Sequence, residues 1–255
     1  MTDGQVLVDV RDAVGWITFS NPVKRNAMSA QMFAAALAAI EKLDGDASVR
    51  VIALRGAGGT FVSGADIGQL TSSPGHADAA EPGILEQVAR VGKPIVALLE
   101  GWCLGGGVVL ALAADLRIGT PGLKFGIPAA RLGAAYPLDA VTALVRRAGP
   151  GLAAQLLLSG QSIDGQRAYD VGLLNWLFDE SEFESKASDV LGALAANAPL
   201  TLLASKRAIA AAFDEQHGDR TQAAAAAAAV CWKSADFKEG REAFLAKRSP
   251  RFTAT

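Results

Sequence analysis

The sequence predicts an α/β protein in which a sheet is covered by helices. Three observations support this prediction. Short apolar runs alternate with segments of helical periodicity through the first half of the chain. Glycine-containing turns follow two of the apolar runs, near Gly64 and near Gly106. From about Glu180 onward the chain is rich in alanine, the residue with the best helix propensity.

The first half of the chain begins with a predicted hairpin. Residues 6–10 alternate apolar and polar side chains, residues 15–19 form a second apolar run, and a short turn separates them. Ser29 is a candidate N-cap for a helix that ends near residue 43, because apolar side chains recur on one face of that segment. The other elements expected in this half are strands at 49–54 and 94–99, a surface loop at 71–82 and a helix at 81–91.

The second half predicts short strands first and then helices. Ser162 or Asp164 is expected to cap a short helix. Residues 223–229 are seven consecutive alanines, which predict a buried and closely packed helix. The other expected elements are strands at 116–118, 123–125 and 174–178, and helices at 138–147, 150–158 and 236–247.

The composition excludes several classes of protein. The 255 residues are 51% hydrophobic, which is enough for one large core. Lys and Arg number 24 against 26 Asp and Glu, so no nucleic acid partner is expected. The two cysteines form no disulfide framework and fit a reducing, cytoplasmic compartment. We recognise no signal peptide, and the longest apolar run, after Gly105, is shorter than the roughly 20 residues of a membrane span, so no membrane partner is expected.

The stretch 101–115 is the centre around which the chain is organised. Three consecutive glycines, Gly105 to Gly107, lie between a buried strand and an apolar helix that ends near Asp115. The helix start directs free N–H groups and the positive end of the helix dipole outward, which suits a phosphate, a carboxylate or a developing oxyanion. The alternative is structural, since glycine also allows a helix to pack tightly on a sheet.

An ordered set of short motifs runs along nearly the whole chain. The motifs are Asn21-Pro22-Val23-Lys24-Arg25-Asn26-Ala27, Phe61-Val62-Ser63-Gly64-Ala65-Asp66-Ile67, Lys93-Pro94-Ile95-Val96-Ala97, Gly101-Trp102-Cys103-Leu104-Gly105-Gly106-Gly107, Ala114-Asp115, Phe125-Gly126-Ile127-Pro128, Ala168, Gly172-Leu173, Phe244 and Lys247. In this order, the set resembles the crotonase (enoyl-CoA hydratase/isomerase) superfamily.

The resemblance implies a crotonase-like spiral of ββα units with a helical C-terminal region. It implies a core domain at 1–195 that binds an acyl-CoA thioester and a trimerisation region at 196–255, in a homotrimer or a dimer of trimers. The oxyanion hole of the family maps onto the backbone N–H groups of Ala65 and Gly106. Fixed donors there stabilise the charge that develops on the thioester oxygen. Coenzyme A enters as part of the substrate, so no separate cofactor and no metal is expected.

The chain departs from the family pattern at both catalytic glutamates of the hydratases. Val109 and Ala129 stand at the matching positions. Hydration needs one group to activate water and another to supply a proton, and neither side chain can do so. We therefore expect poor hydratase activity and favour isomerase-like or other enolate chemistry. The alternative within the same fold is a catalytically weak acyl-CoA-binding protein.

Three residues are candidates to replace the missing glutamates. Tyr136 either donates a proton or forms part of the pocket wall. Asp139 is either a base or a cap of the helix that begins beside it. Glu86 is a third candidate base, although a lone helical glutamate is more often solvated.

Other residues are expected to contact the substrate. By the resemblance, Lys24 and Arg25 lie near the pantetheine or phosphate region, where positive groups suit CoA phosphates. Phe244 and Lys247 are expected to reach the adenine and 3′-phosphate at a neighbouring subunit. The alternative for all four is ordinary surface charge and helix packing. The remaining expected contacts are Ala27, Asp66, Ile67, Trp102, Val109 and Ala129, with Asp66 favoured as a structural turn residue.

A nucleotide-binding α/β protein is the alternative outside the family. In that case the glycines near Gly106 would hold phosphate. The spacing Gly-x-Gly-x-x-Gly is absent there, however, and so is a Walker Gly-Lys-Ser/Thr sequence. This alternative is therefore the weakest, and binding of acyl-CoA without NAD or ATP would exclude it.

Overall fold

The computed structural model describes residues 4–66, 84–212 and 218–255, and its main sheet has six strands in the order β1-β2-β3-β4-β6-β9. β1 runs antiparallel to β2, and the other neighbours in this sheet are parallel. The strands are β1 (Gln5–Arg11), β2 (Val14–Ser20), β3 (Val51–Gly56), β4 (Ile95–Leu99), β6 (Leu116–Gly119) and β9 (Trp176–Leu177). The α/β prediction and the N-terminal hairpin are confirmed.

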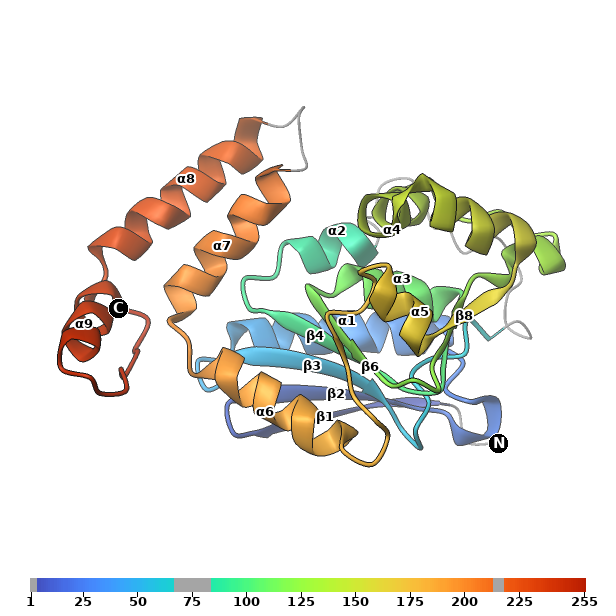
Figure 1. Cartoon of the computed structure of the whole chain (residues 1–255), viewed down its shortest axis with the longest axis horizontal. Coiled ribbons are helices and arrows are strands. Elements are labelled where there is room, and N and C mark those ends of the chain that lie inside the picture. Colours follow the sequence, from blue (N-terminus) through green and yellow to red (C-terminus); the bar gives the residue numbers. More distant parts are fainter. Residues whose placement is uncertain (1–3, 67–83, 213–217) are drawn as a thin grey trace.

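Helices cover both faces of the sheet. Figure 1 shows α6 (Phe183–Ala195) on one side, and α2 (Ile84–Ala89), α3 (Gly106–Ala113) and α4 (Leu138–Ser159) on the other. Each side has its own apolar cluster, and the larger one includes side chains of α1 (Ala30–Gly45) and α3. The strand residues between the helices are almost continuously apolar, as expected for parallel strands buried on both faces.

The cap predicted for α1 is confirmed. The Ser29 hydroxyl oxygen accepts a hydrogen bond from the Met32 N–H at 3.2 Å. This bond satisfies one of the helix-start donors that have no partner inside the helix. α1 then buries Met32, Ala36, Ile40 and other apolar side chains, so its inner face is fixed on the sheet.

A second, three-stranded sheet was only partly expected. Its order is β5-β7-β8, with β5 at Trp102–Leu104, β7 at Lys124–Gly126 and β8 at Ser162–Asp164. The sequence predicts that a glycine turn leads directly from the strand at 94–99 to the helix after Gly105. That prediction was wrong, because the short strand β5 lies between them. β5 has only three residues, which is too short for an alternating pattern to be recognised.

The segment after β8 confirms one predicted cap. The Asp164 carboxylate accepts a hydrogen bond from the Arg167 N–H at 2.8 Å and so caps α5 (Gly165–Asp170). The two helices predicted at 138–147 and 150–158 form one element, α4, that is broken at Gly149, where φ is 76°. Pro150 follows the break, because proline cannot continue an uninterrupted helix.

The last helices extend away from the sheet. Figure 1 shows α7 (Pro199–Ala212) and α8 (Gly218–Lys233) side by side, with α9 (Ala235–Leu245) at the far end. α7 is tied to the core through Lys206, whose ammonium group lies 2.8 Å from the Asp115 carboxylate and donates to the Lys93 carbonyl at 2.9 Å. The domain boundary proposed at residue 195 falls at the end of α6.

The burial predicted for the alanine run 223–229 was wrong, although the run is helical. Within the part of α8 whose side chains are described, Ala227 is buried and most of the other alanines are exposed. Alanine composition favours a helix but does not specify what covers it. In the single chain, α8 packs on α7 and α9 and has no sheet beneath it.

The tail segment 248–255 folds back onto α9 through two carboxylates. Glu239 accepts two hydrogen bonds from the Arg248 guanidinium, at 2.6 and 2.8 Å, and one from the Arg251 N–H at 2.8 Å. Buried Asp236 accepts from the backbone N–H groups of Thr253 and Ala254 at 2.6 and 2.9 Å. The tail is therefore attached to α9 mainly through charge-assisted hydrogen bonds.

We expect Glu239→Gln to loosen the tail segment 248–255 at neutral pH. The bonds from Arg248 and Arg251 lower the Glu239 pKa to about 2. Since this is below the ordinary value of 4.5, the contribution to stability is complete above pH 4.5 and is lost as the pH falls from 4.5 to about 2. Trypsin should therefore cleave the variant after Arg248 and Arg251 faster than wild type. Glu86→Gln, exposed on α2, is the control for loss of a surface carboxylate, and equal cleavage of all three proteins would contradict the prediction.

No single helix among the described residues has both the length and the apolar composition needed to cross a membrane. α6 and α7 meet that composition only when combined across a bend of 100°.

Candidate active site

Two glycine turns lie side by side because backbone pairing aligns the segments that carry them. Val62 pairs with Cys103 of β5 in a parallel bridge, and Ala65 pairs with Met28. The Val62 N–H donates to the Trp102 carbonyl, and the Leu104 N–H donates to the Val62 carbonyl, both at 2.9 Å. The turn at Gly64–Ala65 is therefore fixed beside the turn at Gly105–Gly106.

The N–H groups of Ala65 and Gly106 are free of protein acceptors within the described residues. In the bridge between Ala65 and Met28, the Met28 N–H donates to the Gly64 carbonyl and the Asp66 N–H donates to the Met28 carbonyl. This pairing leaves the Ala65 N–H unused. Gly106 is the first residue of α3, where a helix has no internal acceptor. A methyl group added at Gly106 would lie 3.6 Å from the Ala65 nitrogen, so the two amides are neighbours.

Glycine is required in this turn for two different reasons. Gly105 has φ 48° and ψ -112°, a conformation that residues with a Cβ atom rarely adopt. At Gly107, a Cβ would lie 2.5 Å from the Val62 carbonyl oxygen, so the helix could not approach the neighbouring segment. The run of glycines therefore sets both the direction of the turn and its distance from the Gly64–Ala65 turn.

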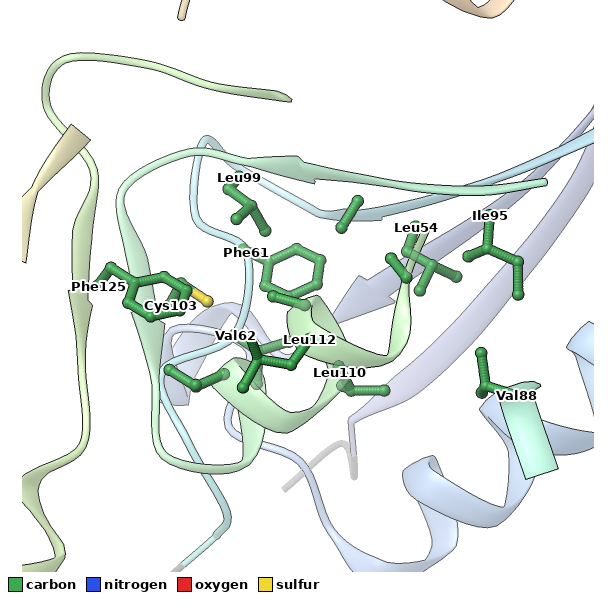
Figure 2. Close-up of a cluster of buried hydrophobic side chains, with 14 of the residues drawn as sticks. Leu54, Phe61, Val62, Val88, Ile95, Leu99, Cys103, Leu110, Leu112 and Phe125 are labelled. Atoms are coloured by element: carbon green, nitrogen blue, oxygen red, sulfur yellow. The ribbon is translucent and has the colours of Figure 1, made fainter. Parts of the chain in front are cut away.

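The core beneath the turns holds them in a fixed relation. Figure 2 shows Phe61 and Val62 packed with Leu110 and Leu112 of α3, and Cys103 beside Phe125. All of these side chains are completely buried. Burial raises the pKa of the Cys103 thiol, so Cys103 is a packing residue and not a nucleophile.

Val109 and Ala129 are both half-buried, on α3 and on the 3-10 helix η3 (Pro128–Leu132) respectively. Val109 also donates its N–H to the Gly105 carbonyl at 3.3 Å. Ala129 packs against the main apolar cluster and accepts a hydrogen bond from the Ala134 N–H at 3.1 Å. Neither position supplies a titratable group.

Tyr136 is the predicted acid/base candidate that contacts the turn directly. Its hydroxyl donates to the Gly105 carbonyl oxygen at 2.9 Å. The side chain is half-buried, and burial raises the pKa of the hydroxyl, with a smaller contribution from Cys103 and Asp139. The hydroxyl therefore stays protonated at physiological pH, and its proton is directed at the protein backbone.

Asp139 and Glu86 lie in different environments. Asp139 is exposed in the first turn of α4, where its carboxylate accepts the Ala140 N–H at 2.8 Å. Pro137, not Asp139, is the N-cap of that helix. Glu86 is exposed on α2 and forms an ion pair with Arg90 at 2.6 Å. Both carboxylates are therefore exposed, and of the two only Glu86 is held in an ion pair with a described residue.

Several predicted substrate contacts gather beside the Ala65 turn. The Lys24 ammonium lies 2.6 Å from the carboxylate of buried Asp66. The Arg25 guanidinium lies over the Trp102 ring, 5.4 Å from its centroid. Ala27 is buried next to them. Ile67 and the predicted loop at 71–82 lie outside the described residues.

Phe244 and Lys247 do not lie at this site. Both are exposed at the end of α9, which Figure 1 places far from α3. Their predicted contact with CoA therefore requires a neighbouring subunit, and it stays a prediction.

Two further residues shape the site and were not singled out from the sequence. Asn26 is buried, and its amide donates to the carbonyls of Ala57 and Thr60 at 2.9 and 2.6 Å, which positions the segment leading to Ala65. Phe33 lies close to Gly106, because a methyl group there would meet its ring at 3.1 Å. The positive φ of Asn26, 59°, is typical of asparagine in tight turns, and its position after Asn21-Pro22 was the available signal.

No group of three or more His, Cys, Asp or Glu side chains within the described residues is arranged to hold a metal ion. The site does bring two backbone donors together. Two neighbouring N–H groups, one of them at a helix start, suit an oxygen that gains negative charge.

Comparisons with known proteins place the chain in a family. The enoyl-CoA hydratase/isomerase family matches residues 9–255. A probable enoyl-CoA hydratase from Bacillus subtilis is 33% identical over 245 residues, covering 94% of this chain and 95% of the relative. The 4-chlorobenzoyl coenzyme A dehalogenase-2 of an Arthrobacter species is 31% identical over 204 residues, covering 76% and 74%. Enoyl-CoA hydratase EchA1 from Mycobacterium marinum superposes with a TM-score of 0.88 at 32% identity, covering 99% of this chain and 100% of that chain. The protein therefore belongs to the enoyl-CoA hydratase/isomerase family, the crotonase superfamily.

Proposed function

We propose that this protein acts on an acyl-CoA thioester by stabilising an enolate in an oxyanion hole. The observation that carries the proposal is the pair of unused N–H groups at Ala65 and Gly106, with a methyl group at Gly106 only 3.6 Å from the Ala65 nitrogen. A base removes a proton from the α-carbon, and the C–H electron pair forms the enolate double bond. The thioester oxygen takes the negative charge and accepts both hydrogen bonds. Reprotonation at another carbon gives an isomer.

We favour this chemistry over simple hydration because Val109 and Ala129 carry no acid or base. The related proteins are named as hydratases and, in one case, as a dehalogenase, so their names alone support several reactions. Hydration needs two proton-transfer groups, whereas enolate formation needs only one base besides the oxyanion hole. The apolar side chains at these two positions therefore favour the enolate reaction.

Asp139 is the base that the described structure supports best among the three candidates. The Tyr136 proton is already directed at the Gly105 carbonyl. Glu86 is paired with Arg90. Asp139 forms no ion pair with any described residue, and its charge contributes to the raised pKa of Tyr136, whose hydroxyl contacts the Gly105 turn.

The test of the proposed function is α-proton exchange in deuterated water. Purified protein is incubated with butyryl-CoA, whose α-hydrogens are acidified by the thioester, and separately with crotonyl-CoA. Mass spectrometry follows deuterium uptake at the α-carbon of butyryl-CoA and addition of water to crotonyl-CoA. We expect deuterium uptake into butyryl-CoA and no addition of water to crotonyl-CoA. Binding of both thioesters with no uptake would favour the acyl-CoA-binding alternative, whose support is the apolar pair Val109 and Ala129. Fast hydration of crotonyl-CoA by wild type would contradict the proposal.

We expect Asp139→Asn to lower the exchange rate by about 10²–10⁴-fold, the usual contribution of a general base. The amide keeps the size of the side chain and loses its basicity. Glu86→Gln should exchange like wild type, because that carboxylate is solvated and paired. Asp189→Asn, exposed on α6 at the opposite side of the sheet, is the matched control. Unchanged exchange in Asp139→Asn would remove Asp139 from the mechanism.

Assembly into a homotrimer or a dimer of trimers is also part of the proposal. The C-terminal helices carry large apolar side chains that the single chain leaves exposed, which supports contact with another subunit. These are Val230, Trp232, Leu245 and Phe244, the last 83% exposed. In such an assembly, Phe244 and Lys247 would be placed to reach a neighbouring site. Sedimentation velocity of the wild-type protein tests the oligomeric state, and a monomer would contradict this part of the proposal.

A further inference from the structure

The carbonyl of Gly105 and the N–H of Gly106 belong to the same peptide group. A peptide group is planar, so the direction of the carbonyl also determines the direction of the N–H. The Gly106 N–H is one of the two donors proposed above for the oxyanion hole. Any contact that holds the Gly105 carbonyl therefore also aims this donor.

The conformation of Gly105 does not hold this peptide by itself. Its φ of 48° and ψ of -112° lie outside the ordinary helical and extended regions, and glycine has the widest choice of alternatives. The preceding peptide is fixed by the bond from the Gly105 N–H to the Gly126 carbonyl at 3.0 Å. The orientation of the next peptide depends on the donors that reach the Gly105 oxygen.

Among the described residues, three donors reach the Gly105 oxygen, and one of these three comes from a side chain. The N–H groups of Val108 and Val109 approach it at 2.9 and 3.3 Å from the first turn of α3. The Tyr136 hydroxyl approaches it at 2.9 Å from the segment that precedes α4. A helix of almost any sequence would supply the two backbone donors. The Tyr136 hydroxyl is therefore the donor that depends on the identity of a side chain.

We propose that Tyr136 is a positioning residue of the oxyanion hole, which aims and strengthens the Gly106 N–H by donating to the carbonyl of the same peptide group. This inference rests on the proposed function. A hydrogen bond to an amide oxygen polarises the amide, so its N–H becomes a better donor to the thioester oxygen. The role differs from proton transfer, because the hydroxyl proton stays between Tyr136 and Gly105 throughout the reaction.

The environment of Tyr136 agrees with a permanent donor. Burial raises its pKa, with Cys103 and Asp139 contributing less, so the hydroxyl keeps its proton over the whole physiological range. A hydroxyl has only one proton to donate, and here it is directed at the backbone.

The contact can be measured on the peptide itself. The chain contains only three glycine–glycine peptides, Gly58-Gly59, Gly105-Gly106 and Gly106-Gly107. Protein labelled with ¹³C at the glycine carbonyl and ¹⁵N at the glycine amide therefore gives three peaks in a TROSY-HNCO spectrum. We expect Tyr136→Phe to move the carbonyl ¹³C and amide ¹H of the Gly105-Gly106 peak upfield. The Gly58-Gly59 peak should not move. Tyr169→Phe changes the only other tyrosine and should leave all three peaks in place.

The second measurement is the carbonyl stretch of bound [1-¹³C]butyryl-CoA in isotope-edited infrared spectra. Wild type should shift this band to lower frequency than in water, and Tyr136→Phe should shift it less. In the exchange assay the variant should lose about three- to tenfold in kcat with little change in KM, the size expected for one neutral hydrogen bond that acts in the transition state. A residue that only supported the fold would change KM and thermal stability together with kcat.

The outcomes separate this inference from the proposed function. If the Gly105-Gly106 peak stays in place in Tyr136→Phe, the inference is wrong. It is also wrong if the peak moves while the infrared band and kcat remain those of wild type. If wild type itself neither shifts the thioester band nor exchanges the α-proton, the proposed function fails and the inference fails with it. In that case the spectrum of labelled wild type and Tyr136→Phe still shows whether the hydroxyl contacts the peptide.

Discussion

Gly106→Pro should reduce α-proton exchange by at least about 10²-fold, the usual cost of removing one oxyanion-hole donor. Gly106 is the first residue of α3, the helix position at which proline is tolerated because its missing N–H has no internal acceptor. The substitution therefore removes the proposed donor and preserves the helical hydrogen bonds. Exchange of butyryl-CoA in deuterated water, with circular dichroism to check the fold, measures the effect.

Gly106→Ala is the matched comparison for the proline variant. It retains the N–H and adds only a methyl group, which would lie 3.1 Å from the Phe33 ring and 3.6 Å from the Ala65 nitrogen. The ring must move slightly, so some activity is lost, but less than with proline. If a folded Gly106→Pro protein exchanges as fast as wild type, this amide is not part of the oxyanion hole.

The strands and helices that the sequence predicts correctly are those with a strong local signal. β3 and β4 are almost wholly apolar, and α1 has both a serine cap and an apolar face. β5 has no such signal, because its three residues are defined by pairing with β7, far along the chain. The fold class therefore follows from local patterns, whereas the second sheet depends on long-range pairing.

The alanine-rich helix α8 shows a second limit. Alanine favours a helix because it loses no side-chain conformational entropy when the helix forms, and this effect does not depend on neighbouring elements. Burial depends on what packs against the helix, which composition alone does not specify. The exposed Trp232 and Val230 on the same helix indicate that the described chain leaves this surface open.

The candidate site was predicted from motifs because its central groups are backbone amides. The donors of Ala65 and Gly106 are not marked by any side chain. The glycine run pointed to a helix start that could bind an oxyanion, and the ordered resemblance to the crotonase superfamily assigned the two individual amides. The contact of Tyr136 with the Gly105 carbonyl joins segments 31 residues apart, and the sequence offered Tyr136 only as an acid or a pocket wall. The hydrogen bonds donated by the side-chain amide of Asn26 likewise reach a segment over 30 residues away. Site chemistry of this kind depends on distances that only the folded chain provides.

The double variant Val109→Glu/Ala129→Glu should hydrate crotonyl-CoA at least about 10²-fold faster than wild type, as each introduced group can supply acid or base catalysis. Both positions are half-buried, so a longer side chain can extend towards the open side without replacing core volume. One carboxylate then removes a proton from water as its oxygen bonds to the β-carbon. The other glutamate, in its protonated form, donates a proton to the α-carbon, while the proposed oxyanion hole holds the charge between these two steps.

Val109→Gln/Ala129→Gln is the control that makes this gain interpretable. Glutamine has nearly the size of glutamate and cannot transfer a proton at neutral pH, so this protein should hydrate crotonyl-CoA no faster than wild type. Loss of absorbance of the crotonyl-CoA double bond follows the reaction in all three proteins. If the glutamate pair folds, binds crotonyl-CoA and still adds no more water than wild type, then carboxylates at positions 109 and 129 are not sufficient for hydration in this chain.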